Sequence, residues 1–96
     1  MEFKYIRRWV QKKIDYSNSY LNRLEISGIY FLMKDHKCVY IGQSKNIFVR
    51  LNKHRYSKDY DYSLIYQLDA NNWSYIDKVE KKLIRELQPI LNINHK

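Results

Sequence analysis

The amino-acid sequence predicts an α+β fold, in which a small three-stranded antiparallel sheet is flanked by helices in the order β-β-α-β-α. Two short apolar runs separated by a polar turn indicate a hairpin, and two later segments have helical spacing, with a third strand-like run between them. The 96 residues allow one small domain. We divide the chain into a basic, helical N-terminal extension at residues 1–25 and the α+β domain at residues 26–96.

The N-terminal extension has the pattern of an amphipathic basic helix over residues 3–14. Its apolar positions at helical spacing are Ile6, Trp9, Val10 and Ile14. Such a helix either packs on the domain with its charged face in solvent, or clamps a DNA backbone; a helix lying on a membrane surface is the third alternative. The DNA contacts would come from Arg7, Arg8 and Lys12.

The predicted hairpin joins residues 26–33 to residues 38–41, two runs rich in apolar, β-branched and aromatic residues. Residues 35–37 form the polar turn between them. Gly28 and Gly42 fit a close backbone approach or a bulge better than a regular strand position. Residues 62–68 are the third predicted strand.

Two helices follow from capping residues and apolar spacing. Asn46 is a suitable N-cap for a helix that runs to about Arg55. The second helix begins near Ser74 and runs to about Leu87, because Pro89 disfavours helical backbone in the residue before it.

The charge balance points to a polyanionic partner. Eighteen Lys and Arg against ten Asp and Glu give a formal net charge of +8, which attracts nucleic acid, and DNA is the partner we expect. A generally cationic protein, or one that docks on an acidic protein, is the alternative. The single Cys38 excludes an internal disulfide and a cysteine-rich zinc site. No run approaches the ~18 apolar residues of a membrane span, so we expect a cytoplasmic protein with no membrane partner.

Glu80 interrupts the apolar stripe of the second predicted helix. The stripe consists of Ile76, Val79, Leu83, Ile84 and Leu87. A carboxylate there needs a partner or a proton, because burying it unpaired is unfavourable. A metal ion or a basic side chain would be that partner. The alternative is a glutamate at the edge of the stripe that pairs with a neighbour such as Lys81.

Four further residues are candidates for a site. On the first helix His54 falls among the apolar positions, and Arg50 precedes it by one turn on the same side. Tyr30 and Tyr40 lie beside glycines on neighbouring strands, where their hydroxyls could share a cleft. Each also has an ordinary structural interpretation: a core histidine, a solvated arginine and strand tyrosines.

In this order and spacing, the residues resemble the GIY-YIG nuclease superfamily. The matching segments are Gly28-Ile29-Tyr30, Tyr40-Ile41-Gly42, Arg50-Leu51 with His54, Glu80, and Pro89-Ile90-Leu91-Asn92. Either tripeptide alone would be a weak signal, whereas the ordered set spans about residues 26–94. The resemblance implies the same β-β-α-β-α sheet that the residue pattern predicts.

The resemblance also implies hydrolysis of DNA phosphodiester bonds with one divalent metal ion, Mg²⁺ or Mn²⁺, bound by Glu80. Tyr30 would be the general base or a proton relay, and Arg50 would hold the scissile phosphate. Tyr40 and His54 would position the phosphate or assist proton transfer. Tyrosine is a poor base at its ordinary pKa of about 10, so we expect Arg50 and the metal to lower that pKa. His54 is the alternative base.

Asn92 would anchor the site near the C-terminus in this resemblance. Gln43 departs from the repair-type members, which carry a lysine there, and Lys45 could replace that charge. We expect Lys45 and Arg55 to contact the DNA backbone together with Arg50.

The small size predicts low sequence specificity or recognition of a DNA structure, because phosphate contacts carry no sequence information. A homodimer or a larger partner would supply further specificity. A stand-alone phage or mobile-element nuclease acting in the host cytoplasm fits these features. The alternatives are a non-catalytic basic nucleic-acid-binding module and a protein-interaction domain with a tyrosine-rich surface.

Overall fold

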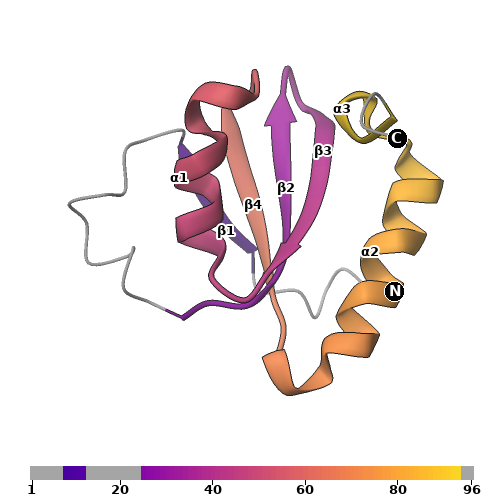
Figure 1. The fold of residues 1–96 in the computed structure, drawn as a ribbon. Helices are drawn as coiled ribbons and strands as arrows, with labels where there is room; N and C mark the ends of the chain where they lie inside the picture. The colour runs from indigo at the N-terminus through magenta and orange to yellow at the C-terminus, as the bar shows by residue number, and fades with distance from the viewer. Residues whose placement is uncertain (1–7, 13–24, 94–96) are drawn as a thin grey trace.

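The computed structural model describes residues 8–12 and 25–93, which form a four-stranded antiparallel sheet with helices on both faces (Figure 1). The elements in chain order are β1 (Arg8–Lys12), β2 (Gly28–Lys34), β3 (Lys37–Ser44), α1 (Ile47–Ser57), β4 (Tyr62–Gln67), the 3₁₀ helix η3 (Ala70–Asn72), α2 (Trp73–Leu87) and α3 (Ile90–Ile93). The strand order is β1-β4-β2-β3, so β2 lies inside the sheet and β3 forms one edge.

The predicted β-β-α-β-α core is confirmed in the elements β2, β3, α1, β4 and α2. The hairpin turn is Asp35-His36, and both residues have positive φ values, 51° and 64°. Positive φ at both central residues is the type I′ pattern, which matches the twist of paired strands. A register shift between Leu32 and Met33 places Tyr40 opposite Leu32 and Cys38 opposite Met33, which leaves one extra residue in β3.

The predicted N-terminal helix is wrong over residues 8–12, which form the edge strand β1. This strand pairs antiparallel with β4, and Trp9 lies opposite Ile65 in the register. Helical spacing and strand spacing both fit so short a segment, and aromatic and β-branched residues such as Trp9 and Val10 favour strands. Pairing with the open edge of β4 satisfies backbone groups that a separate helix would leave unpaired. The remainder of the predicted helix lies outside the described residues.

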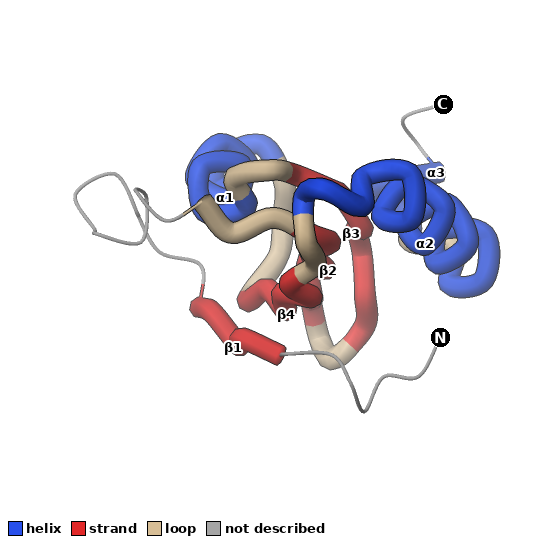
Figure 2. The backbone as a smooth tube through the Cα atoms, turned by 90° about the horizontal axis from the view of Figure 1, so that it is seen from below, coloured by secondary structure: helices blue, strands red, loops and turns tan. Residues whose placement is uncertain are grey.

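Each face of the sheet packs against one helix, and Figure 2 shows α1 and α2 on opposite sides. The cluster on the α1 face contains Tyr30, Leu32, Ile47, Phe48, Leu51, Tyr60 and Ile65. The cluster on the α2 face contains Ile29, Phe31, Ile41, Tyr66, Ile76, Val79 and Leu83. Alternate residues of β2 therefore serve two cores, as the period of two in a strand requires.

The helix ends follow local backbone chemistry. Asn46 occupies the N-cap position of α1 but makes no side-chain capping bond. Helix α2 begins at Trp73, one residue before the predicted cap Ser74, and ends at Leu87. The C-cap residue Gln88 has a left-handed backbone (φ 44°), and its N–H donates to the Ile84 carbonyl at 2.8 Å. Among the described residues, no helix combines the length and apolar character that crossing a membrane requires.

Candidate functional site

Tyr30 lies in the interior strand β2 with its side chain toward α1, and it is only 2% exposed. Its partner across the β2–β3 pair is Gly42. A Cβ atom built on Gly42 would overlap the phenol ring and hydroxyl of Tyr30. Packing of the Tyr30 side chain therefore requires a glycine at position 42.

Gly28 is required for a different reason. Its φ of 139° is rarely adopted by residues with a side chain, and a Cβ would overlap the Tyr66 carbonyl oxygen of β4. Gly28 thus allows β4 to approach the start of β2 closely, and it fixes the strand that presents Tyr30.

Tyr30, Tyr40 and His54 form a cluster of three rings between the sheet and α1. The Tyr30 Oη and His54 Nε2 atoms are 2.8 Å apart, a buried hydrogen bond between residues 24 positions apart in the sequence. The ring centroids are 5.5 Å apart for Tyr30 and His54, 5.3 Å for Tyr40 and His54, and 6.1 Å for the two tyrosines. The structure therefore brings together the two tyrosines and the histidine that the sequence indicated as candidate site residues.

His54 is held in its neutral form by its surroundings. The side chain is 9% exposed, on the face of α1 that also buries Ile47 and Leu51. Burial, followed by the charges of Lys58 and Arg50, lowers the pKa of His54 to about 4. At neutral pH this imidazole has a nitrogen free to accept a proton or a hydrogen bond.

The charge of Arg50 lowers the pKa of Tyr30, as the sequence predicts, but it does not by itself bring that pKa below its ordinary value. Burial, followed by the charge of Tyr40, raises the pKa of the Tyr30 hydroxyl well above its usual range. The charge of Arg50 acts in the opposite direction but is outweighed, and Glu80 raises the pKa further. Of the two candidate bases, His54 is therefore the one with an available lone pair at neutral pH.

Arg50 is an exposed residue of α1, one turn before His54. Its charge lowers the pKa of both His54 and Tyr30. An exposed guanidinium beside this hydrogen-bonded pair can bind an anion from solvent with two parallel hydrogen bonds.

Glu80 comes from α2, on the other side of the sheet, and its side chain is half-buried. Burial, followed by the charge of Asp77, raises its pKa to about 7, and Lys81 acts in the opposite direction. The carboxylate is near enough for its charge to raise the pKa of Tyr30. The charges of Arg50 on α1 and Glu80 on α2 thus both affect the Tyr30 hydroxyl, although the two helices cover opposite faces of the sheet.

The structure does not contain the predicted alternative, an ion pair between Glu80 and Lys81. Lys81 instead donates to Asp77 Oδ2 at 2.7 Å. Asp77 Oδ1 accepts from Gln43 Nε2 at 2.9 Å, which ties α2 to the edge strand β3. Among residues 8–12 and 25–93, no hydrogen bond or ion pair involves the Glu80 carboxylate, so its charge is available to a cation.

Asn92 anchors the C-terminal helix α3 to the edge strand β3. Its Oδ1 accepts from the Ile41 N–H at 2.8 Å, and its Nδ2 donates to the Ile41 carbonyl at 2.9 Å. The amide thus replaces a neighbouring strand at the edge of the sheet. Ile41 lies between Tyr40 and Gly42, so Asn92 acts on the site through the backbone and does not touch the ring cluster in these contacts.

The residues predicted to bind nucleic acid are distributed over several elements. Lys45 is exposed, and its Nζ lies 5.5 Å from the centroid of the Trp73 ring at the start of α2. The guanidinium of Arg55 lies 4.2 Å from the ring centroid of Tyr56. Arg8 and Lys12 belong to β1, and Arg7 lies outside the described residues.

The residues around Glu80 fit a metal ion only if the substrate supplies further ligands. Within the described part of the chain, no group of three or more His, Cys, Asp or Glu side chains is placed to hold one. Glu80 is a hard oxygen ligand to which no cation of the described residues is bound, and the ionised Asp77 nearby favours a positive charge there. Phosphate oxygens and water would complete the coordination.

Sequence reasoning missed Lys58, whose Nζ lies 4.7 Å from the Tyr40 ring centroid. It also missed the contact between Gln43 and Asp77. Lys58 follows His54 by four residues, so a longer predicted helix would have placed it beside the site.

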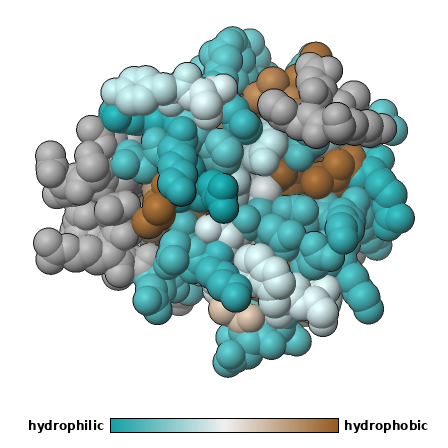
Figure 3. Space-filling view, in the orientation of Figure 1, coloured by the Kyte–Doolittle hydropathy of each residue, from teal (hydrophilic) through white to brown (hydrophobic). Residues whose placement is uncertain are grey.

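A separate groove of about 450 Å³ lies where β3 begins and α2 ends. Its lining consists of Lys37, Cys38, Val39, Leu87, Gln88 and Ile90. Figure 3 shows hydrophobic surface exposed on the right of the molecule among mostly hydrophilic side chains. None of the lining residues belongs to the ring cluster.

Comparisons with known proteins find no match to this chain. No family model matches it, and neither curated proteins nor solved structures gave a match. The function must therefore be argued from the site itself.

Proposed function

We propose that the protein is a divalent-metal-dependent DNA endonuclease that hydrolyses phosphodiester bonds, as its resemblance to GIY-YIG nucleases implies. The observation that supports this most is the buried hydrogen bond between Tyr30 and His54, at 2.8 Å. The charges of Arg50 and Glu80, from two different helices, both act on that tyrosine. Hydrolysis of a phosphodiester can use each of these groups.

The proposed proton path uses neutral His54 as the final acceptor. The attacking water gives a proton to Tyr30 Oη as the Tyr30 hydroxyl proton passes to His54 Nε2, so Tyr30 stays neutral throughout. The water oxygen forms the new bond to phosphorus while the bond to the 3′ oxygen breaks, and that oxygen takes a proton from solvent. A phosphate anion bound beside His54 would raise its pKa toward neutrality and strengthen it as a base.

Arg50 holds the phosphate in this proposal, because its fork bonds two phosphoryl oxygens and opposes the charge that builds there. Glu80 would bind the metal ion, which supplies a second positive charge for the phosphoryl oxygens. Tyr40 packs against both Tyr30 and His54 and keeps their rings oriented.

Binding would depend mainly on phosphate contacts by basic side chains, including Lys45 and Arg55. Such contacts favour a DNA shape and not a base sequence. We therefore propose low or structure-based specificity, and a second copy or a partner would be needed for more.

The test is a cleavage assay on supercoiled, linear and branched DNA with Mg²⁺ or Mn²⁺. Tyr30→Phe, Arg50→Ala and Glu80→Ala should each reduce cleavage by at least about 100-fold with the fold retained. The matched controls are Tyr66→Phe on the other face of the sheet, and the exposed Arg85→Ala and Glu86→Ala on α2.

Cleavage that persists in EDTA and in Glu80→Ala would overturn the proposed chemistry. Salt-sensitive DNA binding without cleavage under any divalent ion would favour the binding-module alternative.

A further inference from the structure

Asp77 and Glu80 lie on one side of α2, at the boundary between its buried and exposed faces. They are three positions apart, so their side chains project from neighbouring turns of the helix. Both are partly buried, whereas Lys78 and Lys81 are exposed. The helix therefore places two carboxylates close together and partly shields them from water.

Gln43 of β3 reaches the same side of α2 from the sheet. It alternates with Ile41, whose side chain belongs to the core on the α2 face, so Gln43 also points toward α2. Its Nε2 donates to Asp77 Oδ1 at 2.9 Å. This hydrogen bond fixes the orientation of the amide, because the carboxylate accepts from its nitrogen end and would repel its oxygen end.

The other end of the same amide, Gln43 Oε1, is buried and accepts no hydrogen bond from the described residues. Buried side-chain oxygens are normally paired with a donor, because leaving one unpaired is unfavourable. Since Oε1 and Nε2 belong to one planar group, a donor for Oε1 would lie next to Asp77. The Glu80 carboxylate, one turn further along α2, also makes no hydrogen bond or ion pair with the described residues.

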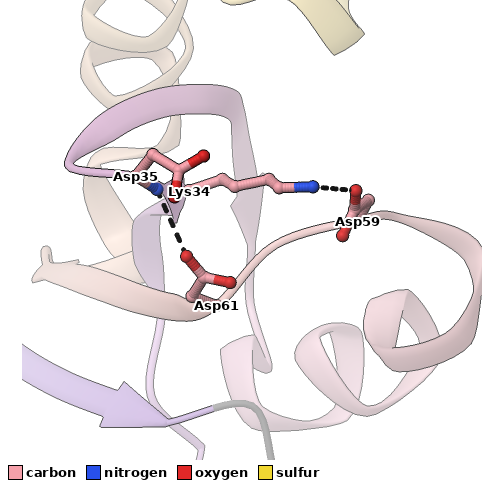
Figure 4. A network of polar contacts seen from close by, with 4 residues as sticks. All are labelled: Lys34, Asp35, Asp59 and Asp61. Atoms are coloured by element: carbon pink, nitrogen blue, oxygen red, sulfur yellow. Dashed lines mark hydrogen bonds and ion pairs between the residues drawn. The ribbon is translucent and has the colours of Figure 1, made fainter.

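The acidic cluster at the β2–β3 hairpin lacks such an oxygen (Figure 4). Lys34 pairs with Asp59. Asp61 Oδ2 accepts from the Asp35 N–H at 3.2 Å. Of the buried side-chain atoms that are unpaired among the described residues, none belongs to this cluster. The buried amide oxygen, and not the number of carboxylates, therefore distinguishes the site on α2.

Resting on the proposed function, we propose that Gln43 is a positioning residue of the metal site. Glu80 binds the divalent ion directly, while Gln43 Oε1 and Asp77 accept hydrogen bonds from water molecules bound to that ion. Mg²⁺ usually keeps several water ligands in proteins, and the outer groups that orient a metal's ligands strongly affect its affinity. The metal site is then built from both α2 and the edge strand β3.

The first test locates the ion with Mn²⁺ as the probe, on the wild-type protein without DNA. Mn²⁺ broadens the NMR signals of nearby protons, so the side-chain amide signals of Gln43 should disappear at substoichiometric Mn²⁺. Gln67 is the matched control, because its Oε1 is also buried and unpaired but it alternates with Ile65 on the α1 face. Its amide signals should broaden far less. Glu80→Ala should abolish the effect at Gln43.

The second test measures Mn²⁺ affinity by electron paramagnetic resonance in variants of the surrounding residues. Gln43→Met has a similar length but lacks both polar atoms of the amide, and it should weaken binding by about 10–100-fold. Gln67→Met and Asp61→Asn are controls that should leave the affinity unchanged. Lys81→Met should strengthen binding, since it removes the ammonium that holds Asp77 Oδ2.

Urea denaturation of the same variants separates a structural role from a role at the metal. If Gln43→Met loses stability but keeps its Mn²⁺ affinity, Gln43 is only a link between β3 and α2 and the inference is overturned. Equal broadening of the Gln43 and Gln67 amides in the wild type would overturn it as well.

The two proposals can fail separately, because neither test requires cleavage. Mn²⁺ bound beside Gln43 in a protein that does not cut DNA would refute the endonuclease and keep the inference. Metal-dependent cleavage without any effect of Mn²⁺ at Gln43 would refute the inference and keep the endonuclease.

Discussion

The ring of Tyr30 lies against Gly42, its direct partner across the β2–β3 pair. Only a residue without a Cβ leaves room for the phenol at this position. The hydroxyl of Tyr30 reaches His54 from there. The Tyr30 side chain therefore links the steric requirement for glycine at position 42 with the hydrogen bond to His54 on α1.

Gly42→Ala is expected to destabilise the protein by about 1–3 kcal/mol, because the added methyl group must displace the Tyr30 ring in a packed core. Urea denaturation measures the free energy of unfolding. In a Tyr30→Leu background the same substitution should cost less, since the phenol is absent. An equal cost in both backgrounds would contradict the direct steric link.

Tyr30→Phe should lower the free energy of unfolding by about 0.5–1.5 kcal/mol, because His54 Nε2 loses its buried partner. Chemical denaturation checks this loss separately from activity. The control is Tyr66→Phe, which removes a hydroxyl from another buried strand tyrosine. A stability unchanged by Tyr30→Phe would mean that the hydrogen bond contributes nothing to the fold.

Asn92→Ala should destabilise the protein by about 1–3 kcal/mol, since two hydrogen bonds to the edge strand are lost. Hydrogen exchange should show faster exchange of the Ile41 amide, whose acceptor is the Asn92 side chain. The exposed Asn71→Ala is the matched control. Unchanged protection of Ile41 would show that the amide does not hold this edge.

His54 and Glu80 should make opposite contributions to the pH dependence of stability. The folded pKa of His54, about 4, lies below its ordinary 6.5, so its contribution is complete above pH 6.5 and is lost as the pH falls toward 4. The folded pKa of Glu80, about 7, lies above its ordinary 4.5, so it destabilises the protein increasingly as the pH rises from 4.5 to 7.

Urea denaturation between pH 4 and pH 7 separates these contributions in the variants. Glu80→Gln should make stability fall more steeply on acidification than in the wild type, and His54→Gln should make it fall less steeply. Each change is at most about 1.4 kcal/mol per pH unit. Identical slopes in the wild type and in both variants would contradict both pKa shifts.

The sequence predicted the core elements because their signals are local. The apolar runs of β2, β3 and β4, the polar turn at residues 35–37 and the stop at Pro89 each depend on near neighbours. The same local signals failed at residues 8–12, where five residues fit a helix or a strand equally well. Pairing with β4 decided between them.

By itself, the sequence determined which chemical groups are available: two tyrosines beside glycines, a histidine and an arginine on one helix, and a glutamate inside an apolar stripe. Tertiary structure decided how these groups affect one another. Burial outweighs the charge of Arg50 and keeps the Tyr30 hydroxyl protonated, and it leaves His54 neutral. The pairing of Lys81 with Asp77 left Glu80 without that lysine. Such effects depend on distances and on the exclusion of water across elements far apart in the chain, which spacing along one helix or strand does not contain.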